Sequence, residues 1–439
     1  MAPLPERILI VGGGVFGLST AQSLSKRHPN SQVTLIEASP TIPNPHGSSV
    51  DSSRIIRADY SHPTYAKLAA EATDLWRRSE WGRDGRYTQN GLLLVYPDGD
   101  STAKDYTTKS YHNVKGLGEH VQLLPTKRDV LRAAPAYGET LNVAGGYVNW
   151  SSGWANAEAG VRFAKQKLDE QGKVRFITRE VISLLFSETD NHTVTGVVLA
   201  DKTNITADLV ILATGAWTAA LVDLRGRAVS TGQAIAYMRI SDEEQRRLEK
   251  MPTILNFATG IFIIPPRNNV LKIARHAYGY HNPKAIPVPG SRTGETMRVS
   301  LPETGVPIPL EGEIAFRTAL KQLLPTFADR PFTDTRICWY TDTPKGDFIV
   351  TAHPSYPRLF LATGGSGHAY KFFPVIGDKV VDALEGTLAP ELQDLWAWPE
   401  AVDEGKFEGT EDGSRSGEKR LLLLEELAKT RRAGRAGVL

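Results

Sequence analysis

Cysteine is almost absent from this chain, which has a single one, Cys338, among its 439 residues. A lone thiol cannot close an intrachain disulfide, so its side chain serves either packing or reactivity. In a chain of this length an unpaired cysteine is more often an inert buried thiol. A reactive role for Cys338 therefore needs support from the rest of the sequence.

An excess of charge of one sign is also lacking, as are long apolar runs. The formal net charge of +2 gives no reason to expect a nucleic acid or a membrane surface as partner. No stretch reaches the ~18 apolar residues of a membrane helix, and the N-terminus has no secretory h-region. We predict a monomeric intracellular protein that acts on a small molecule, without nucleic acid, membrane or metal. Its location is cytoplasmic or peroxisomal, although residues 437–439 do not match the usual Ser-Lys-Leu signal.

A glycine-rich turn stands between two short apolar runs near the start of the chain. Residues 7–37 predict a βαβ unit, with a helix from about residue 16 to 26 and a second strand at 32–36. The turn matches G-x-G-x-x-G, whose glycines let the backbone approach a pyrophosphate at the helix N-terminus. The acid 20 residues past the last glycine can accept hydrogen bonds from ribose hydroxyls and would repel a phosphorylated ribose. The predicted dinucleotide contacts are Gly12, Gly14, Val15, Phe16, Gly17 and Glu37.

Two later strand-plus-glycine signals favour FAD as the dinucleotide. They are Ala213-Thr214-Gly215 and Ala362-Thr363-Gly364-Gly365, and they suggest one long ligand that passes several parts of the chain. A second G-x-G-x-x-G for a nicotinamide dinucleotide is absent. A flavin without a nicotinamide site indicates an oxidase, or a dehydrogenase that passes its electrons elsewhere, with oxygen the simplest acceptor.

The positions of these signals predict two interleaved domains, because nucleotide-type strands occur at the start, middle and end of the chain. The fold class is α/β and α+β, a Rossmann-like FAD-binding domain interleaved with a mixed β-sheet substrate domain. The FAD-binding domain is predicted at residues 1–60, 145–225 and 336–400, and the substrate domain at residues 61–144 and 226–335. Residues 401–439 are predicted as a charged tail, either a docked helix at about 418–432 or a loosely held segment.

Four further runs resemble the sarcosine oxidase branch of the D-amino acid oxidase superfamily, over about residues 7–390. The runs are Ser52-Ser53-Arg54-Ile55-Ile56-Arg57, Leu271-Lys272-Ile273-Ala274-Arg275-His276, Cys338-Trp339-Tyr340-Thr341 and Ser366-Gly367-His368-Ala369-Tyr370-Lys371-Phe372. The segment from Gly146 to Ala155 also resembles fungal saccharopine and fructosyl amino acid oxidases.

The resemblance implies a role for residues in each run. Cys338 would carry FAD through a thioether to the flavin 8α carbon, and Lys272 would activate oxygen beside the flavin. Arg57 and Lys371 would hold a substrate carboxylate. Further residues implied near the flavin or in the substrate pocket are Ser53, Arg54, His276, Tyr340, Gly367 and His368.

Without the resemblance, several of these residues have simpler interpretations. Lys272 could be a solvent-facing charge on a strand, Arg54 and Arg57 a solvated pair, and His276 a hydrogen-bonded structural histidine. Two departures from the bacterial enzymes also stand out, Val50 in place of a histidine and Phe262 in place of a pocket tyrosine. Both argue against sarcosine itself as the substrate.

We therefore predict an FAD-dependent oxidase of the carbon–nitrogen bond of N-substituted amino acids that carry a carboxylate. Saccharopine, pipecolate or fructosyl amino acids are the expected kind of substrate. The imine product would hydrolyse, and oxygen would be reduced to hydrogen peroxide. The alternatives are a biosynthetic amine oxidase that makes an iminium for cyclisation, and a flavoprotein dehydrogenase with a separate electron acceptor.

Overall fold

One sheet has six strands and is mainly parallel. Its neighbouring strands run parallel except for the antiparallel pair at one edge. In pairing order the strands are β22 (Ile349–Ala352), β23 (Leu359–Thr363), β13 (Leu209–Leu212), β1 (Arg7–Val11), β2 (Gln32–Glu37) and β9 (Val174–Thr178).

The second large sheet has ten strands and is mostly antiparallel. Nine lie in the order β24 (Leu421–Leu422), β18 (Tyr280–His281), β14 (Val229–Arg239), β17 (Val270–Arg275), β16 (Ile261–Arg267), β15 (Thr253–Asn256), β5 (Leu92–Tyr96), β7 (Gly145–Asn149) and β6 (Val121–Leu124). The tenth, β21 (Asp334–Asp342), pairs with β14. Three small sheets are formed by β3 (Arg54–Ile56), β8 (Gly153–Ala155) and β4 (Tyr87–Thr88), by β10 (Val181–Phe186), β11 (Val194–Leu199) and β12 (Asn204–Thr206), and by β19 (Pro283–Pro287) and β20 (Thr296–Ser300).

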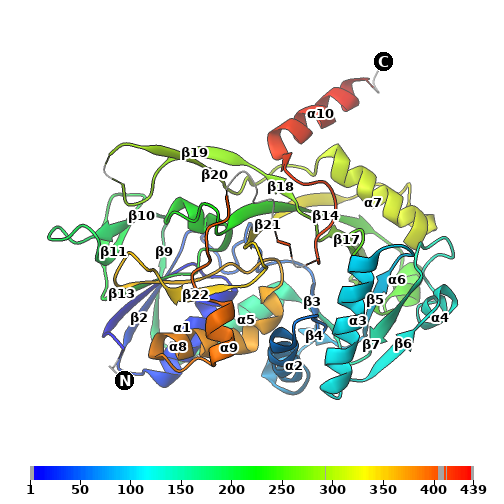
Figure 1. Cartoon of the computed structure of the whole chain (residues 1–439), viewed down its shortest axis with the longest axis horizontal. Coiled ribbons are helices and arrows are strands. Elements are labelled where there is room, and N and C mark those ends of the chain that lie inside the picture. Colours follow the sequence, from blue (N-terminus) through cyan, green and yellow to red (C-terminus); the bar gives the residue numbers. More distant parts are fainter. Residues whose placement is uncertain (1–3, 292, 404–409, 412, 437–439) are drawn as a thin grey trace.

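The computed structural model describes residues 4–291, 293–403, 410–411 and 413–436. Figure 1 shows the strands β2 and β13 of the mainly parallel sheet on the left, and β5, β7 and β17 of the larger sheet on the right. The mixed α/β fold class is therefore confirmed. The α-helices are α1 (Val15–Arg27), α2 (Pro63–Arg78), α3 (Ser101–Gly116), α4 (Lys127–Ala133), α5 (Ala157–Gln171), α6 (Asp242–Leu248), α7 (Leu310–Leu323), α8 (Phe373–Glu385), α9 (Pro390–Leu395) and α10 (Leu423–Ala436). No described helix is both long and apolar enough to span a membrane.

The predicted βαβ unit is formed by β1, α1 and β2. Its strands are apolar and almost fully buried because α1, α5 and α8 pack together and cover one face of the parallel sheet (Figure 1). The helix α8 begins at Phe373. Pro374 suits the first turn of a helix, where a missing N–H costs nothing, and Val375 and Ile376 bury an apolar stripe.

The register of the ten-stranded sheet places two predicted site residues on one face. Tyr237 of β14 pairs with Lys272 of β17, and Gln233 of β14 pairs with Cys338 of β21. Because side chains alternate along a strand and these β14 residues are an even number apart, Lys272 and Cys338 share a face. The two neighbours of Lys272 along β17 lie in an apolar cluster on the opposite face.

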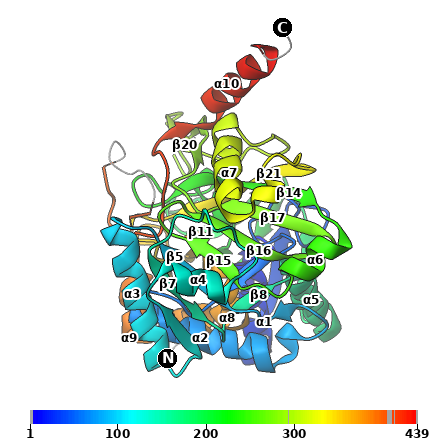
Figure 2. The same ribbon diagram turned by 90° about the vertical axis from the view of Figure 1, so that its right-hand side faces the viewer.

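Two strands, β7 and β21, belong to a different sheet from the one that the predicted domain limits imply. β7 and β21 lie in the ten-stranded sheet, although residues 145–149 and most of β21 were predicted in the FAD-binding segments. The tail is anchored: β24 pairs in parallel with β18, and Leu423 and Leu427 are buried. Only the rest of α10 projects from the body in both views (Figures 1 and 2). Residues 404–409, 412 and 437–439 of the predicted tail lie outside the described residues, and the division into two domains stays a prediction.

Candidate active site

The glycine turn lies at the carboxyl end of β1. Gly12 has φ +108°, and a Cβ there would stand 2.4 Å from the Ala213 carbonyl oxygen. A Cβ on Gly17 would stand 1.9 Å from the Gly12 carbonyl oxygen, so neither position admits a larger residue. The turn lines a cavity of about 660 Å³, and at the N-terminus of α1 the Val15 amide donates to Ser49 Oγ at 3.0 Å. This cradle has the size and the backbone donors that a dinucleotide requires.

Glu37 holds this turn as well as lining the cavity. Its Oε2 accepts a hydrogen bond from the Gly13 amide at 2.7 Å, and its Oε1 accepts from the Ser39 amide and the Asn44 side chain, both at 2.9 Å. The carboxylate therefore fixes the backbone of the turn, a role that the sequence did not reveal. Its predicted contact with a ribose would use the lone pairs that remain.

The two cations predicted to hold a carboxylate lie around one aromatic ring. The Arg57 guanidinium carbon is 4.7 Å from the Tyr60 ring centroid, and Lys371 Nζ is 5.1 Å from it. Arg57 is 7% exposed, and its Nη1 has no hydrogen-bond partner among the described residues. Lys371 is 4% exposed, and among the described residues the hydrogen bonds of its Nζ go to the Tyr60 hydroxyl and the His368 carbonyl oxygen, not to a carboxylate. Burial, followed by the charge of Arg57, holds the pKa of Lys371 well below its usual value.

A hydrogen-bond chain runs from Lys371 to His368. Lys371 Nζ donates to the Tyr60 hydroxyl at 2.8 Å, and that hydroxyl lies 2.8 Å from His368 Nδ1. His368 Nε2 lies 2.8 Å from the Gly346 carbonyl oxygen, which can only accept. The neutral ring therefore carries its hydrogen on Nε2 and accepts from Tyr60 on Nδ1. Burial, then the charge of Lys371, holds the pKa of His368 well below its usual value, in agreement with this neutral form.

The segment that resembles the fungal oxidases, residues 146–155, forms hydrogen bonds with the side-chain carboxylate of Asp59, two residues after Arg57. Asp59 is fully buried and accepts from the Tyr147 hydroxyl, the Asn149 amide and the Ser152 hydroxyl, with distances of 2.7, 3.1 and 2.7 Å. Desolvation raises the pKa of Asp59. These bonds tie β7 and the turn after it to the segment that carries Arg57.

A second group gathers on the face of the ten-stranded sheet. Lys272 is 3% exposed, so it is not the solvent-facing charge of the simpler interpretation, whereas Cys338, at 1% exposed, is buried as both interpretations of the thiol require. Arg54 Nη2 donates to Cys338 Sγ at 3.3 Å. Gly367 has φ +71°, and a Cβ there would stand 2.3 Å from Tyr340, so glycine lets this ring pack against the backbone.

Asp51, which the sequence did not single out, lies at the centre of this second group. It accepts from Lys272 Nζ at 2.7 Å, from the Tyr237 hydroxyl at 2.7 Å and from Arg54. The Ser53 carbonyl oxygen accepts from Lys272 Nζ at 2.8 Å and from Arg54 Nη1 at 3.4 Å. The available signal was an acid three residues before Arg54, directly before the run that begins at Ser52.

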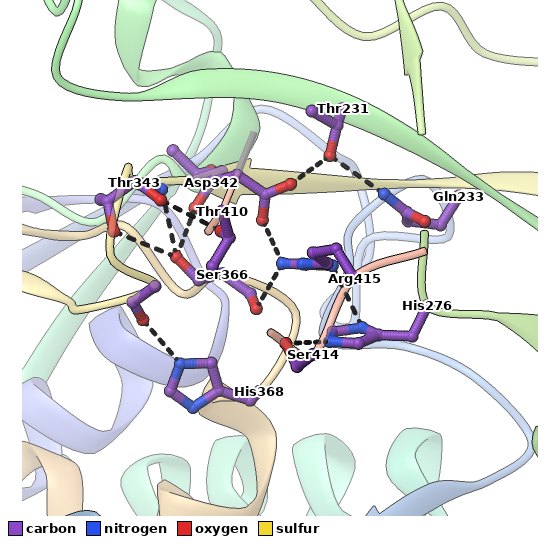
Figure 3. A network of polar contacts seen from close by, with 12 residues as sticks. Thr231, Gln233, His276, Asp342, Thr343, Ser366, His368, Thr410, Ser414 and Arg415 are labelled. Carbon is purple, nitrogen blue, oxygen red and sulfur yellow. Dashed lines mark hydrogen bonds and ion pairs between the residues drawn. The ribbon is translucent and has the colours of Figure 1, made fainter. Parts of the chain in front are cut away.

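Arg415 is the other residue that the sequence did not reveal, and Figure 3 shows how it enters the site from the tail. Its Nη2 donates to Asp342 Oδ1 at 2.5 Å and to the Ser366 carbonyl oxygen at 2.8 Å, and its guanidinium lies 5.2 Å from the Tyr340 ring centroid. Thr231 of β14 donates to the other oxygen of Asp342 at 2.6 Å. Arg415 stands in a polar, glycine-containing stretch without periodicity, so no local pattern indicated this role.

Arg415 also sets the state of His276. An arginine can only donate, so His276 Nδ1 accepts from Arg415 Nη1 at 3.1 Å (Figure 3). The hydrogen of the neutral ring is then on Nε2, 3.4 Å from Ser414 Oγ. Burial, followed by the charge of Arg415, holds the pKa of His276 well below its usual value. His276 is thus a neutral, hydrogen-bonded side chain, and its contact with a substrate stays a prediction.

The predicted residues fall into connected groups, with two exceptions. The side chains of Val15 and Phe16 are buried in the core, so any contact with the cofactor would come from their backbone. Val50 is buried, and Phe262 has its ring centroid 5.8 Å from Lys272 Nζ. The described residues that line the 660 Å³ cavity include Gly12, Gly14 and Glu37 but none of the cations Arg54, Arg57, Lys272 and Lys371. The cavity and the two groups of cations are therefore separate parts of the predicted site, and their roles stay predictions.

Comparison with known proteins agrees with this geometry. The model of the family described as DAO, FAD dependent oxidoreductase, matches residues 7–383. The amino acid oxidase imqH of Aspergillus flavus is 33% identical, covering 90% of this chain and 98% of that protein. The L-saccharopine oxidase of Schizosaccharomyces pombe is 29% identical, covering 90% and 94%. A modified fructosyl peptide oxidase from Aspergillus nidulans, solved in complex with FSA, superposes with a TM-score of 0.84 at 28% identity, covering 96% of this chain and 98% of that one.

Proposed function

The chain belongs to the DAO family of FAD dependent oxidoreductases, and from this premise we propose that it oxidises N-substituted amino acids. The observation that carries the proposal is the buried pair of cations around Tyr60. Arg57 has an unpartnered Nη1 and Lys371 lacks a described carboxylate partner, so the site can accept one anionic group. An amino acid carboxylate has the matching charge and geometry.

FAD fits the residues that are present. The glycine turn, Glu37 and the N-terminus of α1 would hold its pyrophosphate and ribose, since Gly12 and Gly17 allow the tight turn, where a Cβ at either position would meet a backbone carbonyl oxygen. When bound, FAD accepts a hydride equivalent from the carbon next to the substrate nitrogen and passes two electrons to oxygen. The protein's part is to dock the carboxylate on Arg57 and Lys371 and to keep positive charge at Lys272, where the charge of reduced oxygen develops. Two electrons and two protons give hydrogen peroxide.

We propose that the flavin is covalent through Cys338. The support is positional: Cys338 shares a sheet face with Lys272, and Arg54 places a cation against its sulfur. Acid precipitation of the purified protein tests this, because a covalent flavin stays yellow in the pellet. Cys338→Ala should release the flavin into the supernatant, and a pellet that stays yellow would move the attachment to another residue.

The activity is tested by hydrogen peroxide release with matched pairs of amines. Saccharopine, pipecolate and a fructosyl amino acid should each be compared with a primary amino acid of similar size. Arg57→Met should raise KM by about 30-fold or more, from the roughly 2–5 kcal/mol cost of leaving a buried charge unpaired. An unchanged KM, or flavin reduction by every primary amine, would contradict the proposed carboxylate dock and substrate class.

Lys272→Met separates the two half-reactions. Flavin reduction by substrate should be nearly unchanged, while reoxidation by oxygen should slow by orders of magnitude because the fixed cation is lost. If Lys272→Met and the unchanged protein were reoxidised at equal rates, Lys272 would have no role in the reaction with oxygen. Reduction without any peroxide would instead favour a dehydrogenase, and a cyclised amine product would favour a biosynthetic oxidase.

We also propose a monomer in the cytoplasm or peroxisome, to be tested by size-exclusion chromatography and cell fractionation.

A further inference from the structure

The Asp51 carboxylate joins four donors from separate parts of the fold. Its Oδ2 accepts from Lys272 Nζ of β17 and from Arg54 of β3, and its Oδ1 accepts from the Tyr237 hydroxyl of β14 and the Ser52 amide, both at 2.7 Å. The side chain of Asp51 is 0% exposed. With both oxygens occupied, the carboxylate is held in one orientation.

This arrangement leaves one N–H of Lys272 uncommitted. An ammonium group has three donors, and two of them go to Asp51 and to the Ser53 carbonyl oxygen, 2.7 and 2.8 Å away. The direction of the third is therefore fixed by the other two. Phe262 lies on one side of Nζ, with its ring centroid 5.8 Å away.

Asp51 is also the carboxylate that offsets the buried positive charge here. The charged and titratable groups that face it are Lys272 on β17, Arg54 on β3, Tyr237 on β14, and Arg336, Cys338 and Tyr340 on β21. Burial lowers the pKa of Lys272 to about 8, with Asp51 acting in the opposite direction and Arg54 in the same direction as burial. Without the Asp51 charge, Lys272 would face Arg54 uncompensated and would lose its proton at a lower pH.

We infer that Asp51 is a positioning residue that keeps Lys272 protonated and aimed, and that holds Arg54 against Cys338. The inference rests on the proposed function for Lys272 and names the residue on which that function depends. Asp51 touches neither substrate nor the reacting atoms in this proposal; it acts through its two cationic partners.

Asp51→Asn tests the inference, because it removes the charge and keeps the shape. The flavin is reduced with dithionite, so that no amine substrate is needed, and is then mixed with oxygen over a range of pH. A lower Lys272 pKa shifts the loss of fast reoxidation to lower pH. Near pH 8 the rate should fall about fivefold, because a shift of about one unit lowers the charged fraction of the lysine from about a half to roughly a tenth, and the rate should recover toward pH 6. A pH titration of Asp51→Asn, followed by the visible spectrum of its oxidised flavin without substrate or oxygen turnover, should have its midpoint at a correspondingly lower pH than that of the unchanged protein.

Three further variants make the outcome specific. Tyr237→Phe removes an uncharged partner of Asp51 and should move the midpoint by less than about half a unit. Asp51→Glu keeps the charge and should keep the midpoint near that of the unchanged protein. This variant also provides a test at position 51 if Asp51→Asn does not fold. In a Lys272→Met background, Asp51→Asn should slow reoxidation no further, because its effect passes through Lys272.

Unshifted midpoints in Asp51→Asn, equal shifts in Asp51→Asn and Asp51→Glu, or additive losses in the double variant would each overturn the inference. Failure of the proposed function looks different. In that case Lys272→Met itself would reoxidise at the normal rate, while the spectral titration would still report whether Asp51 and Lys272 are coupled. The flavin fraction retained in acid-precipitated Asp51→Asn should fall, since Arg54 loses its anchor beside Cys338; full retention would overturn that part of the inference.

Discussion

Arg415→Met should destabilise the whole protein, although Arg415 lies in the C-terminal segment. The side chains of Arg415 and Asp342 are 1% and 0% exposed, so the substitution breaks an ion pair in the protein interior. Breaking such a pair costs about 3–5 kcal/mol. Unfolding entropy of about 2.1 cal/mol/K per residue gives roughly 0.9 kcal/mol/K for 439 residues. The expected decrease in Tm is therefore about 3–5 °C.

Thermal unfolding of the flavin-loaded protein measures this, with Arg432→Met as the matched control. Arg432 is an exposed arginine of α10, and its replacement should change Tm by less than about 1 °C. Asp342→Asn should cost about as much as Arg415→Met, since it leaves the arginine unpaired. The double variant should cost less than the sum of the two by roughly 1–3 kcal/mol. An unchanged Tm for Arg415→Met, or strictly additive losses, would refute the claim that the tail is fixed by a buried ion pair.

Two other predictions concern the substrate side of the site. Burial holds the pKa of Lys371 well below its usual value, and a bound carboxylate would raise that pKa, so binding should take up a proton. The Kd of a carboxylate probe such as benzoate, measured from the flavin spectrum, should stay low in acid and increase as the pH rises through the pKa of Lys371 in the free protein. A pH-independent Kd would show that Lys371 does not bind the carboxylate. Gly367→Ala should lower Tm more than Gly386→Ala does, because both glycines have φ near +70° but only a Cβ at Gly367 would meet Tyr340, at 2.3 Å. Equal effects would show that the ring moves aside freely.

Predictions from local sequence patterns are correct where the contacts are local. β1, α1 and β2 follow from an apolar run, a glycine turn and a second apolar run within residues 7–37. The resemblance added candidate residues, of which Arg57 and Lys371 lie around one ring and Lys272 and Cys338 share one face.

The residues that the sequence did not reveal act over long separations. Asp51 binds Lys272 across 221 positions, and Arg415 binds Asp342 across 73 and His276 across 139. Tyr60, which brings Arg57 and Lys371 together, bonds Lys371 across 311 positions. No periodicity or motif in one sequence encodes such pairs, because each depends on which strands become neighbours.

The sequence alone therefore determined a dinucleotide unit, because glycine conformation, strand alternation and helix start signals act within a few residues. It also determined that one thiol, Cys338, was available for a special role. Only the tertiary structure decided what surrounds that thiol. Pairing of β14 with both β17 and β21 sets Cys338 and Lys272 on one face, and the buried charge of Asp51 offsets the cations gathered beside them. Buried charges must be compensated wherever the fold brings them, and for this protein the compensating groups come from distant segments.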